Sequence, residues 1–176
     1  ASIFSNSSSS PKQFDFWFRR EADTVLDVSS FFYISFQNGD WVYFWRNGSQ
    51  VGVTIKQSGT QYGYAGSYTN FAVYVWHHVR IRFSGQDVII AAGGDQRASY
   101  TVPFSNAWPG SPSNPVNDVV FGDFPPLVGS SDYGWRGYLD DIQWLENDYG
   151  YIGGSYTVPT RPWGEYDPYA VGTALA

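Results

Sequence analysis

Apolar and polar residues alternate along much of this chain with the two-residue period of strands that bury one face. In residues 14–19 phenylalanine takes every second position, and residues 32–37 alternate in the same way. The clearest case is residues 78–83, where valine, isoleucine and phenylalanine stand between histidine and arginine. The pattern predicts a protein built from half-buried strands.

Tight turns connect these segments. Asn38-Gly39 and Asn47-Gly48 are dipeptides typical of β-hairpins, so residues 31–56 are expected to form a three-strand antiparallel meander. Residues 59–66 and 103–117 are rich in glycine, proline or serine and are expected to be loops. Further strands are expected at residues 88–92, 118–121 and 138–145. About ten short strands predict an all-β fold, a two-sheet antiparallel jelly-roll sandwich.

Composition supports this interpretation and excludes some classes of partner. Aromatic residues make up 20% of the chain, beside 19 Gly and 10 Pro, a balance typical of strands and turns. The net charge is −6 and the pI is about 4.6. A protein that binds nucleic acid or an anionic membrane typically carries excess positive charge, so neither is an expected partner. With no Cys, disulfides and thiolate chemistry are excluded. No signal peptide, transmembrane segment or membrane insertion is expected, since no long apolar stretch occurs.

Three regions are expected along the chain. Residues 1–11 are serine-rich and predict an N-terminal arm without a core of its own. Residues 12–149 hold the predicted strands and form the jelly-roll domain. Residues 150–176 are rich in glycine, proline and tyrosine and predict an extended C-terminal tail. In this interpretation the two arms dock the domain to neighbouring protein subunits of an assembly.

Four segments carry a family resemblance. They are Phe14-Asp-Phe-Trp-Phe-Arg, Trp76-His-His-Val-Arg-Ile, Val120-Phe121-Gly122 and Gly137-Tyr-Leu-Asp-Asp-Ile-Gln-Trp. In this order they resemble strands of the laminin-G-like and concanavalin-A-like lectin and glucanase jelly rolls. The resemblance implies the jelly-roll fold. Members of that superfamily include lectins, carbohydrate-binding modules, glycoside hydrolases, polysaccharide lyases, adhesion modules and domains of phage particles, so the fold alone assigns no function.

The catalytic acids of the glucanase branch are missing. That branch places acids on one face of a strand, where one acts as nucleophile and another as general acid. Glu21-Ala-Asp23 lacks the third acid of the pattern. Asp140 and Asp141 are sequence neighbours, whose side chains should point to opposite faces of a strand. We therefore expect no glycosidase activity.

A lyase would need a base and a group that binds a carboxylate. His78, Arg80 and Arg82 could supply them from one strand face. The favoured interpretation is an exposed polar face opposite the apolar stripe of the same strand. The protein is accordingly expected not to be an enzyme.

Metal binding is weakly indicated. His77 and His78 are adjacent on a strand and cannot chelate one ion together, and His77 is expected to be a buried, hydrogen-bonded histidine. Calcium is the one cofactor left open, because loop carboxylates are its usual ligands. The candidate ligands are Asp123, Asp132 and Asp140.

The aromatic excess is the main functional signal. On one predicted strand, three large aromatic residues alternate with Val42 and Phe44. Successive side chains of a strand point to opposite faces, so one of these two sets must face away from the core. Sugar rings stack on such amphipathic aromatic surfaces. The candidate carbohydrate-binding residues are Trp41, Tyr43 and Trp45 of that strand, with the loop residues Trp108, Tyr133 and Trp135. Packing of these rings under loops or against a neighbouring subunit is the open alternative.

The expected function is that of a non-catalytic module, a surface-displayed structural or adhesion component of a virus or phage particle. Its aromatic residues would offer weak, multivalent contacts to cell-surface glycans. The expected location is the virion surface or the cell exterior. The alternatives are a free-standing carbohydrate-binding module or lectin and, third, a polysaccharide lyase.

Overall fold

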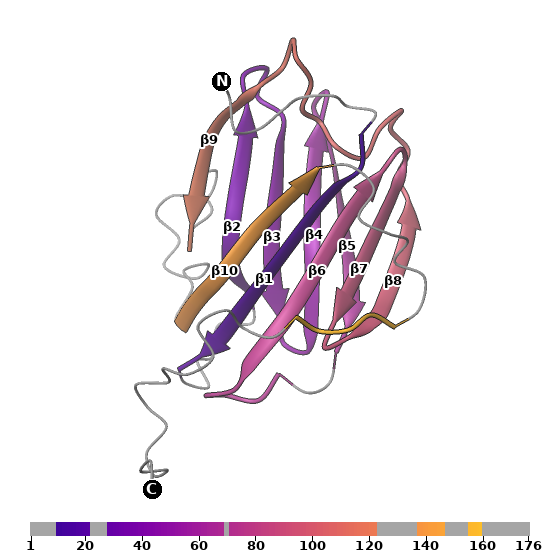
Figure 1. The fold of residues 1–176 in the computed structure, drawn as a ribbon. Helices are drawn as coiled ribbons and strands as arrows, with labels where there is room; N and C mark the ends of the chain where they lie inside the picture. Colours follow the sequence, from indigo (N-terminus) through magenta and orange to yellow (C-terminus); the bar gives the residue numbers. More distant parts are fainter. Residues whose placement is uncertain (1–9, 22–27, 69–70, 123–136, 147–154, 160–176) are drawn as a thin grey trace, which may run out of the picture.

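The computed structural model describes residues 10–21, 28–68, 71–122, 137–146 and 155–159. These residues form ten strands, and among them no helix is long and apolar enough to cross a membrane. The strands are β1 (Lys12–Arg20), β2 (Val28–Phe36), β3 (Trp41–Asn47), β4 (Gln50–Gln57), β5 (Thr60–Ser67), β6 (Trp76–Ser84), β7 (Asp87–Ala92), β8 (Asp95–Thr101), β9 (Val116–Phe121) and β10 (Gly137–Glu146). Sheet A has the order β10-β1-β6-β7-β8, and sheet B has the order β5-β4-β3-β2-β9. All strand pairs are antiparallel and the sheets lie face to face (Figure 1), so the predicted two-sheet jelly-roll sandwich is confirmed.

Sheet B is built largely from consecutive strands joined by tight turns. Gly39 and Gly48 have φ angles of 84° and 52°, which glycine adopts without steric cost. These turns set the register that places Val42 opposite Ile34, with both side chains in the core. The predicted meander over residues 31–56 is confirmed. The sheet also contains β5, in a segment where the sequence predicts a loop.

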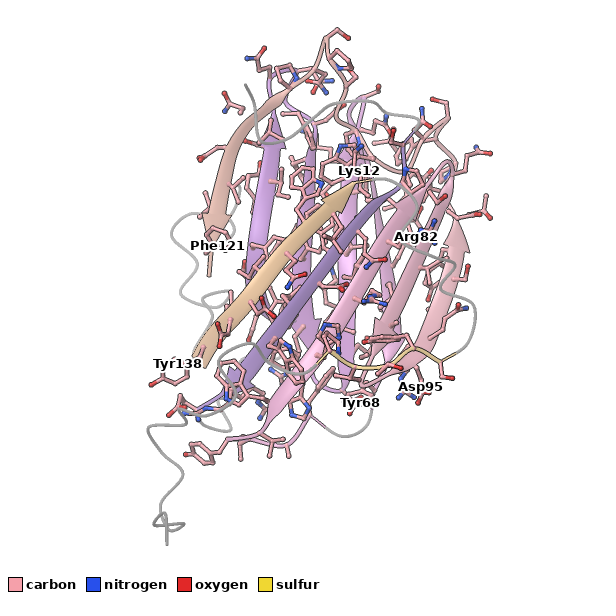
Figure 2. All side chains as sticks on the ribbon, in the orientation of Figure 1. Lys12, Tyr68, Arg82, Asp95, Phe121 and Tyr138 are labelled. Atoms are coloured by element: carbon pink, nitrogen blue, oxygen red, sulfur yellow. The ribbon has the colours of Figure 1, made fainter. Side chains whose placement is uncertain are left out.

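Aromatic side chains fill much of the space between the sheets (Figure 2). Phe14 on β1 of sheet A lies with its ring centroid 6.0 Å from that of Phe32 and 4.8 Å from that of Phe44, both on sheet B. Each buried phenylalanine contributes about 1.5–3 kcal/mol relative to an exposed one. The alternating apolar positions of β1 and β6 therefore act as the contact surface that joins the two sheets.

The loop between β8 and β9 contributes to this core. Trp108 is 2% exposed, and its ring centroid lies 5.2 Å from Phe36 and 5.0 Å from Trp144. The N–H of Ala107 donates to the carbonyl of Gly85 at 2.7 Å and so fixes this part of the loop. The prediction that Trp108 offers an exposed ring to sugar is wrong, because the irregular loop turns its indole inward.

A short stretch after β10, residues 155–159, crosses the outer face of sheet A (Figure 1). Ser155 forms an isolated bridge with Asp95, and the N–H of the next residue donates to the carbonyl of Gly94 at 2.6 Å. We call this stretch the C-terminal strap. The rest of the predicted tail and most of the predicted N-terminal arm lie outside the described residues. The region boundaries stay predictions.

Candidate functional site

The outer face of sheet B carries a compact aromatic cluster. Tyr33, Trp41 and Tyr43 are 7%, 6% and 5% exposed and pack together, with Trp45 and Val120 against them. Of the two sets that alternate on β3, the Trp41, Tyr43 and Trp45 set is the one on the outer face, while Val42 and Phe44 lie in the core. Trp45 is the member of that set with a partly exposed surface. A role of these residues in sugar binding stays a prediction.

A shallow hollow of about 160 Å³ lies beside Trp45. We call it the aromatic hollow, and its lining residues are Val28, Tyr43, Trp45, Asn47 and Thr54. The indole Nε1–H of Trp45 donates to Oγ1 of Thr54 at 2.9 Å, which fixes the orientation of the ring. A hydroxyl, an amide and a phenol thus border one aromatic ring. This arrangement can hold a small ring that has both an apolar face and polar substituents.

The phenol of Tyr33 next to this hollow stays protonated at neutral pH. Burial and, secondarily, the Asp118 carboxylate raise the pKa of Tyr33 above its ordinary value of 10.0. Tyr33 therefore carries a hydroxyl group rather than a phenolate near pH 7. Such groups both donate and accept hydrogen bonds.

A second polar cluster lies on the outer face of sheet A, beside the C-terminal strap. His78 Nδ1 and the Tyr156 hydroxyl are 2.7 Å apart, and the Arg80 guanidinium lies 4.4 Å from the centroid of the Tyr156 ring. Arg80 also donates two hydrogen bonds to the carboxylate of Asp15, with Nε to Oδ1 at 2.7 Å. We call these four residues the strap cluster. The expectation of an exposed polar face is wrong, since His78 is 2% and Asp15 5% exposed, with Tyr156 and Trp17 packed against the imidazole.

Both partners of the hydrogen bond in the strap cluster are neutral near pH 7. Burial lowers the pKa of His78 to about 4 against the pull of Asp15, and burial raises the pKa of Tyr156 to about 12. The hydrogen bond therefore joins two uncharged groups, and the tautomer of His78 decides whether the phenol O–H or the Nδ1–H donates. His77 faces the core instead, with Nε2 3.0 Å from the carbonyl oxygen of Ala72, so the predicted buried, hydrogen-bonded histidine is confirmed.

The predicted calcium ligands are not tested as a set. Asp123 and Asp132 lie outside the described residues, as do the predicted sugar ligands Tyr133 and Trp135. Asp140 accepts a hydrogen bond from the backbone N–H of Asp141 at 2.8 Å, at a bulge where Asp141 has a φ of 48°. The bulge interrupts the regular alternation of side chains between the two faces of β10 that was expected at Asp140 and Asp141. Within the described stretches no three His, Cys, Asp or Glu side chains are grouped to hold a metal ion.

Comparison with known proteins supports the fold alone. The sequence matches no protein-family model and no curated protein. Domains LG4-5 of the mouse laminin α1 chain superpose with a TM-score of 0.58 at 12% identity, covering 80% of this chain and 37% of that chain. The CBM40 module of a Ruminococcus gnavus IT-sialidase gives 0.59 at 13% identity, covering 78% and 76%. A family 7 alginate lyase in complex with substrate gives 0.55 at 12% identity, covering 86% and 67%.

These similar structures show the fold of this chain. It has the laminin-G-like, concanavalin-A-like jelly-roll fold, as the four sequence segments indicated. The structures with this fold include carbohydrate-binding modules and one polysaccharide lyase. At 12–13% identity, no functional residue of these proteins can be assigned to a position of this chain.

Proposed function

We propose that this domain is a non-catalytic carbohydrate-binding module whose ligand occupies the aromatic hollow. The observation that carries the proposal is the position of Trp45, a partly exposed indole held by Thr54 on the outer face of sheet B. The C–H groups on one face of a sugar stack on such a ring, and nearby polar side chains hydrogen-bond to its hydroxyls. The fold's occurrence in a CBM40 module supports the same class of ligand.

In its wider role we propose a surface-displayed adhesion component, on a virion surface or the cell exterior, with neighbouring protein subunits as partners. A hollow this small supports weak contact for each copy, and multiple copies on one surface raise the overall affinity. A free-standing lectin is the alternative. Its isolated monomers would already bind a glycan array measurably, without the gain in affinity that multiple copies provide.

Replacing Trp45 with alanine is expected to weaken binding to glycan-coated surfaces tenfold or more, since a central aromatic contact contributes about 2 kcal/mol. The measurement is binding of the bead-displayed domain to a glycan array. Tyr74→Ala is the matched control, because Tyr74 is 60% exposed and does not line the hollow. Equal binding by the wild type and the Trp45 variant would exclude the hollow as the site.

One observation favours a second candidate function, polysaccharide β-elimination at the strap cluster. The hydrogen-bonded His78 and Tyr156 pair a proton acceptor with a phenol, the two roles that removal of a proton and protonation of the leaving oxygen require. Against it, His78 is 2% exposed and Arg80 is already paired with Asp15. The burial of His78 and the pairing of Arg80 thus disfavour catalysis at the strap cluster.

The elimination candidate predicts ultraviolet absorbance from unsaturated sugar ends when the protein is incubated with alginate or another uronate polymer. Tyr156→Phe would abolish that signal, because the phenyl ring keeps its packing but has no proton to give. We expect no signal from the wild-type protein. An absorbance increase that disappears in the phenylalanine variant would make the strap cluster an active site.

A further inference from the structure

The aromatic hollow is bordered by side chains without charge. Among the described residues that line it, the polar ones are Tyr43, Asn47 and Thr54. Recognition of a sugar carboxylate typically uses Arg or Lys, whose charge-assisted hydrogen bonds are about twice as strong as neutral ones. Neither type lines the hollow, and the net charge of −6 also disfavours an anionic ligand.

Gly52 and Thr54 hold the indole of Trp45 in place. A Cβ at position 52 would lie 2.5 Å from Cζ2 and 2.7 Å from Cη2 of Trp45, so the six-membered ring occupies the space above β4 that a side chain would take. The hydrogen bond to Thr54 fixes the other end of the ring system. The indole is therefore positioned before any ligand arrives, which lowers the entropic cost of binding.

The size of the hollow limits the ligand to one ring. Its volume of about 160 Å³ equals that of about five water molecules and lies well below the ~300–1,000 Å³ of sites for drug-sized ligands. The hydroxyl of Thr54 and the amide of Asn47 can each donate and accept a hydrogen bond, as sugar hydroxyls do, whereas the hydroxyl of Tyr43 is buried. Val28, which pairs with Asn47, adds an apolar surface.

Resting on the proposed carbohydrate-binding function, we propose that the hollow takes a single neutral pyranose residue and discriminates against sialic acid and uronic acids. The apolar face of the pyranose stacks on Trp45, and its hydroxyls meet Asn47 and Thr54. A carboxylate in the same position finds no cation among these lining residues and loses hydration without compensation. Selectivity follows from this difference.

The test compares polymers that each carry one sugar at equal density. The neutral set is glucose, galactose, mannose, N-acetylglucosamine, N-acetylgalactosamine and fucose, and the acidic set is glucuronate, galacturonate and sialic acid. We expect the bead-displayed domain to bind at least one neutral polymer tenfold or more tightly than every acidic one. That binding should change little between low and high salt, because screening acts on charged contacts.

Thr54→Val tests the positioning of the indole, with Thr101→Val on the exposed edge of sheet A as the matched control. The first variant is expected to weaken neutral-sugar binding about fivefold through loss of one hydrogen bond, and the second to leave it unchanged. Preference for an acidic polymer would overturn this inference while leaving the proposed function in place. Binding of neither set would overturn both, and neutral-sugar binding unaffected by Thr54→Val would place the ligand elsewhere and overturn the inference.

Discussion

Replacing Trp108 with alanine is expected to lower the free energy of unfolding by about 3–5 kcal/mol. The indole is 2% exposed and contacts the rings of Phe14, Phe83 and Trp144. Truncation removes these contacts and leaves a cavity that strands from both sheets cannot easily close. Urea unfolding followed by circular dichroism measures the loss.

Trp45→Ala is the control for that experiment, because it removes the same side chain from the outer face of sheet B. We expect it to cost about 1 kcal/mol, as is usual for partly exposed positions. Trp108→Phe should recover much of the loss, since a ring is retained. Equal destabilisation by Trp45→Ala and Trp108→Ala would contradict the assignment of Trp108 to the core.

Acidification from pH 6.5 to pH 4 is expected to destabilise the domain by roughly 3 kcal/mol through His78 alone. The pKa of His78 is about 4 in the folded protein, below its ordinary value of 6.5, because the imidazole is buried. In this pH range the unfolded chain binds a proton that the folded chain does not. The contribution is therefore complete above pH 6.5 and is lost as the pH falls through the folded pKa.

Unfolding free energies measured at several pH values check this expectation. His78→Gln is the comparison, because an amide group can still hydrogen-bond to the Tyr156 hydroxyl but does not titrate. The variant should show a smaller fall in stability than the wild type between pH 6.5 and pH 4. His77 is unchanged in both proteins, so its own lowered pKa cancels from the difference. Parallel curves would show that His78 is not buried as an unprotonated group.

Alternation revealed the strands that bury one face in an aromatic core, such as β1 and β6, because phenylalanine, valine or isoleucine takes every second position there. The same pattern did not predict β5. Its inward positions are Tyr62, Tyr64 and Gly66, and its outward positions include Gly63 and Ala65, so hydrophobicity does not alternate along it. Its strand character comes from pairing with β4 rather than from its own residues.

The strap cluster lies beyond what local patterns can predict. His78 and Tyr156 are 78 positions apart, and no periodicity marks the tyrosine within its segment. Parity placed Trp41, Tyr43 and Trp45 on the face opposite Val42 and Phe44, whereas the burial of Trp41 and Tyr43 was not predictable from it. The burial of His78 on the outer face of sheet A depends on the strap that crosses it, and such a crossing is set by the tertiary fold.

The place of β1 between β6 and β10 has a consequence for biosynthesis. Lys12 pairs with Glu146, so sheet A is incomplete until β10, the last described strand, has left the ribosome. Folding dominated by such distant pairings is slow, on the order of milliseconds to seconds. A nascent or truncated chain without β10 exposes an unpaired β1 edge beside aromatic side chains, which makes it prone to edge-to-edge aggregation. Expression should therefore be sensitive to C-terminal truncation before residue 146.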